Sequence, residues 1–143
     1  MGNRAVITTK GRGKKRVGIY LHWNGGRDSV EAFLAYCKIR KFRGPASDCY
    51  GMARLVQVIA NFFGGDLSIG VDLISNLDCD NGDNGVYVID DNWKIIKREY
   101  FDWIEQHEHD LLDMLKQINQ KQPEADRVPE SELVRFINMR GEI

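Results

Sequence analysis

Apolar residues along this 143-residue chain change their spacing in blocks, and the order of the blocks restricts the fold. Short β-branched stretches predict strands, and spacing of three and four residues predicts amphipathic helices. The expected strands are 4–9, 17–23, 67–75 and the two arms of a hairpin over 86–100 that turns at Asp91-Asn92; the expected helices are about 28–43, 48–63, 101–122 and 129–140.

The resulting order is ββααβββαα, in which strands are clustered and do not alternate with helices. Such clustering predicts an α+β fold, a mostly antiparallel sheet of about five strands packed by three to four helices. The length is typical of one domain, so we expect residues 1–143 to form a single domain.

The stretch VGIYLHWNGGRDSVEAFLAYC (17–37) predicts a strand that enters a double-glycine corner and then a helix. Free amides and the helix dipole make such a corner suitable for an anion, and a tryptophan face can stack on a base. The sequence therefore predicts a pocket for an anionic, nucleotide-like ligand. Its expected ligand-binding residues are His22, Trp23, Asn24, Gly25, Gly26 and Arg27.

A purely structural interpretation of the corner stays open. Asp28 and Glu31 have the spacing of a capping box, in which Asp28 would cap the helix and occupy those amides. Its charge would also repel a phosphate. Glycines in a strand-to-helix turn can serve conformation alone.

Charge is distributed unevenly along the chain, although the net charge is only −1. Residues 1–43 hold eleven Lys or Arg and two acids, whereas residues 44–143 hold nine Lys or Arg and nineteen acids. This asymmetry indicates an anionic partner or head-to-tail contact between copies, unless folding mixes the two halves. The loop after the first strand, with Lys10, Arg12, Lys14, Lys15 and Arg16, is expected to contact a partner or, non-specifically, nucleic-acid phosphates.

Catalysis is an alternative hypothesis that depends on two residues. The motif DCYG places Cys49 at a helix start, where a thiolate is favoured, and it resembles the Asp-Cys-Ser-Gly of papain-like amidases. That resemblance implies a cysteine hydrolase using Cys49 and His22, but His22 precedes Cys49, the reverse of the usual order. Cys49 as a small buried apolar residue is the competing interpretation. We expect no metal site and no cofactor.

Three cysteines without a close pair are typical of a reducing compartment, and no stretch is apolar enough for a signal peptide or a membrane span. A cytoplasmic protein without a membrane partner is expected.

The stretches GIYLHWNGGRDSVEAFLAYC, YGMARLVQVIANFFGG and DNGDNGVYVIDDNW resemble small uncharacterised proteins of Gram-positive bacteria and their phages. The resemblance covers about the first 100 residues and carries no mechanism. It implies a phage or mobile-element accessory protein that inhibits or sequesters a host defence component. We therefore expect a non-enzymatic binding protein whose partner is a host protein or a nucleotide-like small molecule, with self-association left open.

Overall fold

The computed structural model describes residues 2–11, 15–47 and 49–140. Within these residues the chain forms five strands and four α-helices, joined in the order predicted, with three short 3₁₀ turns between them. The strands are β1 (Ala5–Thr8), β2 (Val17–Leu21), β3 (Ile69–Leu73), β4 (Val86–Ile89) and β5 (Ile95–Glu99). The helices are α1 (Arg27–Ile39), α2 (Cys49–Phe63), α3 (Leu111–Lys121) and α4 (Glu130–Arg140). The predicted α+β class is confirmed.

The strands form one mixed sheet whose spatial order, β3-β2-β1-β4-β5, differs from their order along the chain. In the described part, β1 pairs in parallel with β4, and the other three pairings are antiparallel. The parallel pair aligns Val6 with Val86, and the β1–β2 pair aligns Ala5 with Leu21. The N-terminus of β1, the N-terminus of β4 and the C-terminus of β2 therefore lie at one end of the sheet.

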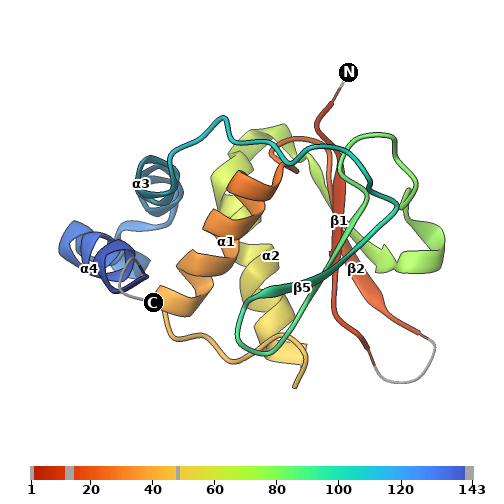
Figure 1. Ribbon diagram of the computed structural model, residues 1–143. Helices are drawn as coiled ribbons and strands as arrows, with labels where there is room; N and C mark the ends of the chain where they lie inside the picture. Colours follow the sequence, from red (N-terminus) through yellow and green to blue (C-terminus); the bar gives the residue numbers. More distant parts are fainter. Residues whose placement is uncertain (1, 12–14, 48, 141–143) are drawn as a thin grey trace.

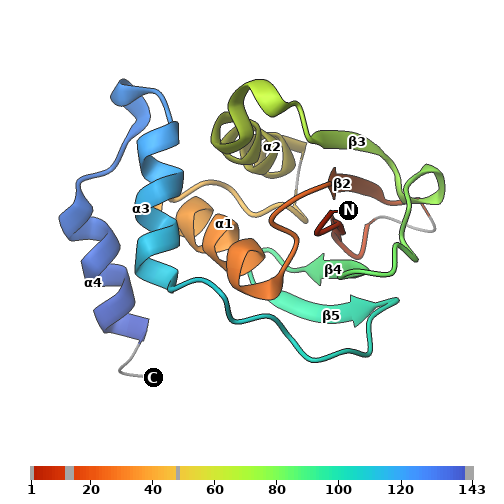
Figure 2. The ribbon, with the colours of Figure 1, turned by 90° about the horizontal axis from the view of Figure 1, so that it is seen from above.

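Helices α1 and α2 cover one face of the sheet, and α3 and α4 stack outside them, farther from the strands (Figures 1 and 2). Helix α1 is the centre of this arrangement, because it packs against both α2 and α3. Its side chains Val30, Phe33, Leu34 and Cys37 are buried, as their helical spacing predicts. Burying each such apolar side chain contributes about 1.5–3 kcal/mol to stability.

The segment 101–110, which we expected to begin a long helix, is irregular, and that prediction was wrong. Helix α3 begins only after Asp110, whose side chain accepts a hydrogen bond from the Asp113 amide at 3.1 Å and so acts as its N-cap. Within the segment, the amides of Glu108 and His109 donate to the Asp28 carboxylate on α1. These tertiary hydrogen bonds replace the helical ones that spacing alone predicts.

The predicted capping box at the start of α1 is also wrong. The N-cap is Gly26, and Asp28 lies inside the first turn. The sequence also predicts Asp48 as the N-cap of α2, and this residue lies outside the described residues. It predicts Gly64 as the residue that ends α2, and this is confirmed, since Gly64 follows Phe63 with a φ of +60°.

Candidate anion-binding site

The glycine corner is filled by the chain's own groups. Gly25 and Gly26 are buried. The Gly25 amide donates to the Asn3 carbonyl oxygen at 2.9 Å, and the Gly25 carbonyl accepts from the Tyr87 hydroxyl at 2.6 Å. A Cβ atom at Gly26 would collide with the Gln106 Oε1 atom. Gly26 thus allows Gln106 to pack closely over the corner, whereas Gly25 allows the close approach of the backbone at Asn3 and Arg4.

Arg27, expected to hold the ligand, is already engaged by two carboxylates. Its Nε atom lies 2.9 Å from Glu31 Oε1, and its Nη1 atom lies 3.3 Å from Glu105 Oε2. Glu105 comes from the segment over the corner. An anion at this corner would have to displace Glu105 and the segment that carries it.

Next to the glycine corner, the His22 and Trp23 side chains contact each other. Their rings lie edge to face with centroids 5.0 Å apart, and His22 Nδ1 lies 3.2 Å from the Tyr20 hydroxyl. Trp23 is 44% exposed, and Asn24 contacts Ser29 at 3.4 Å. At the six predicted residues the structure therefore shows two buried glycines and an arginine already paired with two carboxylates.

Cys49 and His22 lie at opposite ends of the sheet. His22 follows β2 at the end where β4 begins, whereas Cys49 lies two residues beyond Ser47, which hydrogen-bonds to Asp91 just after β4 ends. Strand β4 alone spans about 13 Å. A dyad needs its two side chains within hydrogen-bond reach, and the fold does not bring these two together.

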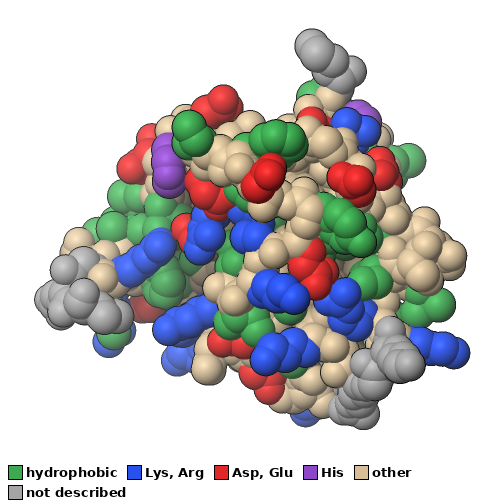
Figure 3. All heavy atoms as spheres, turned by 45° about the vertical axis from the view of Figure 1, so that its right-hand side comes forward, with side chains coloured by type: hydrophobic (Ala, Val, Ile, Leu, Met, Phe, Trp, Pro, Cys, Tyr) green, Lys and Arg blue, Asp and Glu red, His purple; other side chains and the backbone are tan. Residues whose placement is uncertain are grey.

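The end of the sheet near Asp91 gathers most of the basic residues of the N-terminal block. Because β1 and β4 are parallel, the loop after β1 and the turn after β4 lie at the same end. The C-terminus of α1 joins them there, since Trp93 Nε1 donates to the Phe42 carbonyl at 3.3 Å. Figure 3 shows Lys and Arg side chains across the lower half of this face, with most acidic side chains above them. We call this region the basic end; it comprises Lys10, Lys15, Lys38, Arg40, Lys41, Arg43, Arg54 and Lys94.

The predicted basic loop contributes only part of this surface. Lys10 and Lys15 are exposed at the basic end, whereas Arg16 is half-buried and its Nη2 atom lies 3.3 Å from Glu99 Oε1. Arg12 and Lys14 lie outside the described residues. The larger share comes from the run KIRKFR (38–43), which the sequence indicated only as cations that complement the helix dipole.

Most cations of the basic end are not paired. Within the described part of the chain, Lys10, Lys15, Lys38, Arg40, Lys41, Arg54 and Lys94 have no carboxylate within 4.0 Å. The two acids of the β4–β5 turn are occupied by amides. Asp90 Oδ1 accepts from the Asn92 and Lys94 amides at 2.9 and 3.0 Å, and Asp91 Oδ1 accepts from Ala46 and Ser47. The unpaired cations therefore stay available to an external anion.

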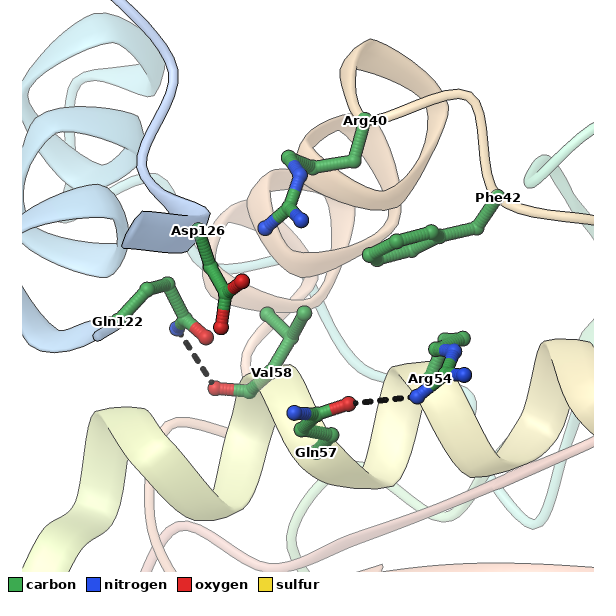
Figure 4. A pocket seen from close by; sticks show the side chains of 7 residues that line it. All are labelled: Arg40, Phe42, Arg54, Gln57, Val58, Gln122 and Asp126. Atoms are coloured by element: carbon green, nitrogen blue, oxygen red, sulfur yellow. Dashed lines mark hydrogen bonds between the residues drawn. The ribbon is translucent and has the colours of Figure 1, made fainter. Parts of the chain in front are cut away.

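A hollow of about 320 Å³ lies within the basic end, between the C-terminus of α1, the middle of α2 and the turn after α3 (Figure 4). Its lining residues are Arg40, Phe42, Arg54, Gln57, Val58, Gln122 and Asp126. The Gln122 amide donates to the carbonyl oxygens of Val58 and Ile118, both at 3.1 Å, and so fixes the floor. The sequence carried no signal for this hollow, because its residues come from three segments far apart in the chain.

We also searched the described residues for a metal site and a membrane span. In the part of the chain that the structure covers, no group of three His, Cys, Asp or Glu side chains is arranged to hold a metal ion. None of the helices described is long and apolar enough to span a membrane.

Comparison with protein-family models, curated proteins and solved structures finds no match to this chain.

Proposed function

We propose that this chain is a non-enzymatic binding protein that holds a nucleic-acid strand at the basic end. The observation that carries this proposal is the convergence of unpaired cations from the β1–β2 loop, the α1–α2 connection, α2 and the β4–β5 turn. Lys and Arg side chains that neutralise phosphates release counterions, which supplies most of the free energy of non-specific binding.

The binding expected is to the backbone rather than to a base sequence. The chain has no helix-turn-helix, zinc-finger or RNP-type pattern that would read base edges. Flexible lysines such as Lys38 and Lys94 suit phosphate contacts, which position a strand and carry no sequence information. A role as a mobile-element inhibitor of a host component, which the resemblance implies, stays a prediction and would use the same surface.

The proposal is tested by fluorescence anisotropy of a labelled single strand of about 20 nucleotides at about 50 and 200 mM salt. We expect affinity to fall as salt rises, and each lost phosphate contact to reduce the slope of log K against log salt by about 0.7. The double variant Lys38→Glu/Lys94→Glu should bind more weakly, with a smaller slope.

The matched control is Lys116→Glu/Arg135→Glu, which changes the net charge equally on α3 and α4, away from the basic end. Its affinity and slope should stay close to those of the wild type. Equal losses in both double variants would mean that only overall charge matters, and the proposal would be rejected.

A further inference from the structure

We infer that the hollow in the basic end is a nucleotide site that holds a phosphomonoester together with the sugar or base attached to it. This inference deepens the proposed function, since it identifies one specific position on the basic end. Its volume of about 320 Å³ lies at the lower limit of pockets that hold small ligands.

Two arginines line the hollow: Arg40 directly follows α1, and Arg54 lies on α2. Figure 4 shows Arg40 and Phe42 on one side of the hollow and Arg54 and Gln57 on α2 opposite them. Arg54 Nη1 donates to Gln57 Oε1 at 3.0 Å, which orients the group and leaves further N–H donors. Neither arginine has a carboxylate within 4.0 Å among the described residues. Guanidinium groups are well suited to a phosphate, which they bind through charge-assisted hydrogen bonds.

Asp126 provides a hydrogen-bond acceptor for a donor group of the ligand. Its carboxylate lines the same hollow but, within the described part of the chain, accepts no hydrogen bond and has no cation within 4.0 Å. A ligand consisting only of an anion would be repelled by it. A ligand that also carries a hydroxyl or amino donor satisfies it, and nucleotides carry both a phosphate and such donors.

Phe42 adds an apolar surface at the mouth. Its ring is half-buried, and the Arg40 guanidinium lies 5.0 Å from the ring centroid. Aromatic rings at such positions stack with bases of any sequence. Gln122 and Val58, both buried and hydrogen-bonded to each other, close one side of the hollow, and the ligand that we infer is a free nucleotide or the end of a strand.

The test uses adenosine 5′-monophosphate and inorganic phosphate as probes, titrated into the full chain and followed by NMR and calorimetry. Arg54→Gln should weaken adenosine monophosphate binding by about tenfold, because it removes charge-assisted hydrogen bonds. Asp126→Ala should lower the preference for adenosine monophosphate over inorganic phosphate by about tenfold. Arg135→Gln, an exposed arginine on α4, is the control and should change neither value. An unchanged affinity in Arg54→Gln, or an unchanged preference in a folded Asp126→Ala, would overturn the inference.

Strands that carry a 5′-phosphate, a 3′-phosphate or no terminal phosphate distinguish the source of the ligand. Tighter binding of a phosphorylated strand, lost in Arg54→Gln, identifies a strand end. Equal binding of all three strands alongside specific binding of adenosine monophosphate identifies a free nucleotide. If strands bind but the mononucleotide does not, the inference fails and the proposed function survives. If the mononucleotide binds but no strand does, the proposed function alone fails.

Discussion

The Oδ2 atom of Asp28, in the first turn of α1, accepts a hydrogen bond from the backbone amide of His109, 81 residues later, at 2.8 Å. The same oxygen accepts from the Glu108 amide at 2.7 Å. This carboxylate helps to hold the irregular segment 101–110 over the glycine corner, where Glu105 of the same segment occupies Arg27. The corner is closed, and the basic end at the opposite end of the sheet is open.

We predict that Asp28→Ala releases the segment without unfolding the protein. Loss of these hydrogen bonds at a half-buried site should lower the free energy of unfolding by about 1 kcal/mol. Hydrogen exchange at Glu108 and His109 should accelerate, whereas exchange in α1 should change little. Asp102→Ala, in the same exposed segment, is the control. Unchanged exchange at Glu108 and His109 would contradict this account.

Arg98 is expected to be a major contributor to stability. Its guanidinium lies 3.8 Å from the Tyr87 ring centroid and 3.9 Å from that of Phe101, donates to the Asn84 carbonyl at 2.6 Å and pairs with Glu105. Arg98→Ala should therefore cost about 2–4 kcal/mol in urea unfolding, since it removes both ring contacts, takes away the donor of the Asn84 carbonyl and leaves Glu105 paired with Arg27 alone. Arg98→Lys should recover only part of this, because an ammonium cannot stack between two rings. Full recovery by lysine would show that charge alone is important.

Stability should fall at alkaline pH through two buried tyrosines. Burial raises the pKa of Tyr36 and of Tyr87, although the nearby Arg40 and Arg98 act in the opposite direction. Unfolded tyrosine loses its proton near pH 10, whereas the folded protein keeps it. The contribution is therefore complete below about pH 10 and is lost as pH rises above it. Urea unfolding at about pH 8 and about pH 11 should show a smaller alkaline loss in Tyr87→Phe than in the wild type; equal losses would contradict the assignment.

The three cysteines should react in a fixed order. Cys49 is exposed, Cys79 is half-buried and Cys37 is fully buried, and burial raises the pKa of the last two thiols. Iodoacetamide labelling followed by mass spectrometry should modify Cys49 first and Cys37 only on unfolding. Strand binding should be unaffected by Cys49→Ala, because this residue plays no part in the basic end. Abolished binding in a folded Cys49→Ala protein would reopen the cysteine hypothesis.

The order of elements was predictable because periodicity reports which face of each segment is buried. The buried stripe of α1 follows that rule, whereas β1 and β4 are buried at every position and were predictable from their short β-branched and aromatic composition. The long helix at 101–122 was not predictable in full, because Arg98, Asp28 and Arg27 bind its first ten residues in another conformation. The cap assigned to Asp28 failed for the same reason, since its carboxylate serves a contact distant in sequence.

The candidate site was likewise only partly predictable from the sequence. The charge asymmetry of residues 1–43 indicated an anionic partner, but the sequence directed attention to the corner at Arg27, which Glu105 occupies. Local patterns could not reveal that Arg40, Arg54 and Asp126 line one hollow, because this requires the packing of α1, α2 and the turn after α3. For the basic end as a whole, the local signals were the loop with Lys10 and Lys15 and the run at 38–43, whose cations are equally typical of a helix C-terminus.

The most direct measurement is an amide NMR titration of the full chain with a single strand of about 20 nucleotides. The account predicts shifts concentrated at residues 38–43, around Arg54 and in the turn 90–94, with little change at Gly25, Gly26 and residues 101–110. Shifts centred on the glycine corner, or no shifts at low salt, would contradict the claim that the basic end is the binding surface.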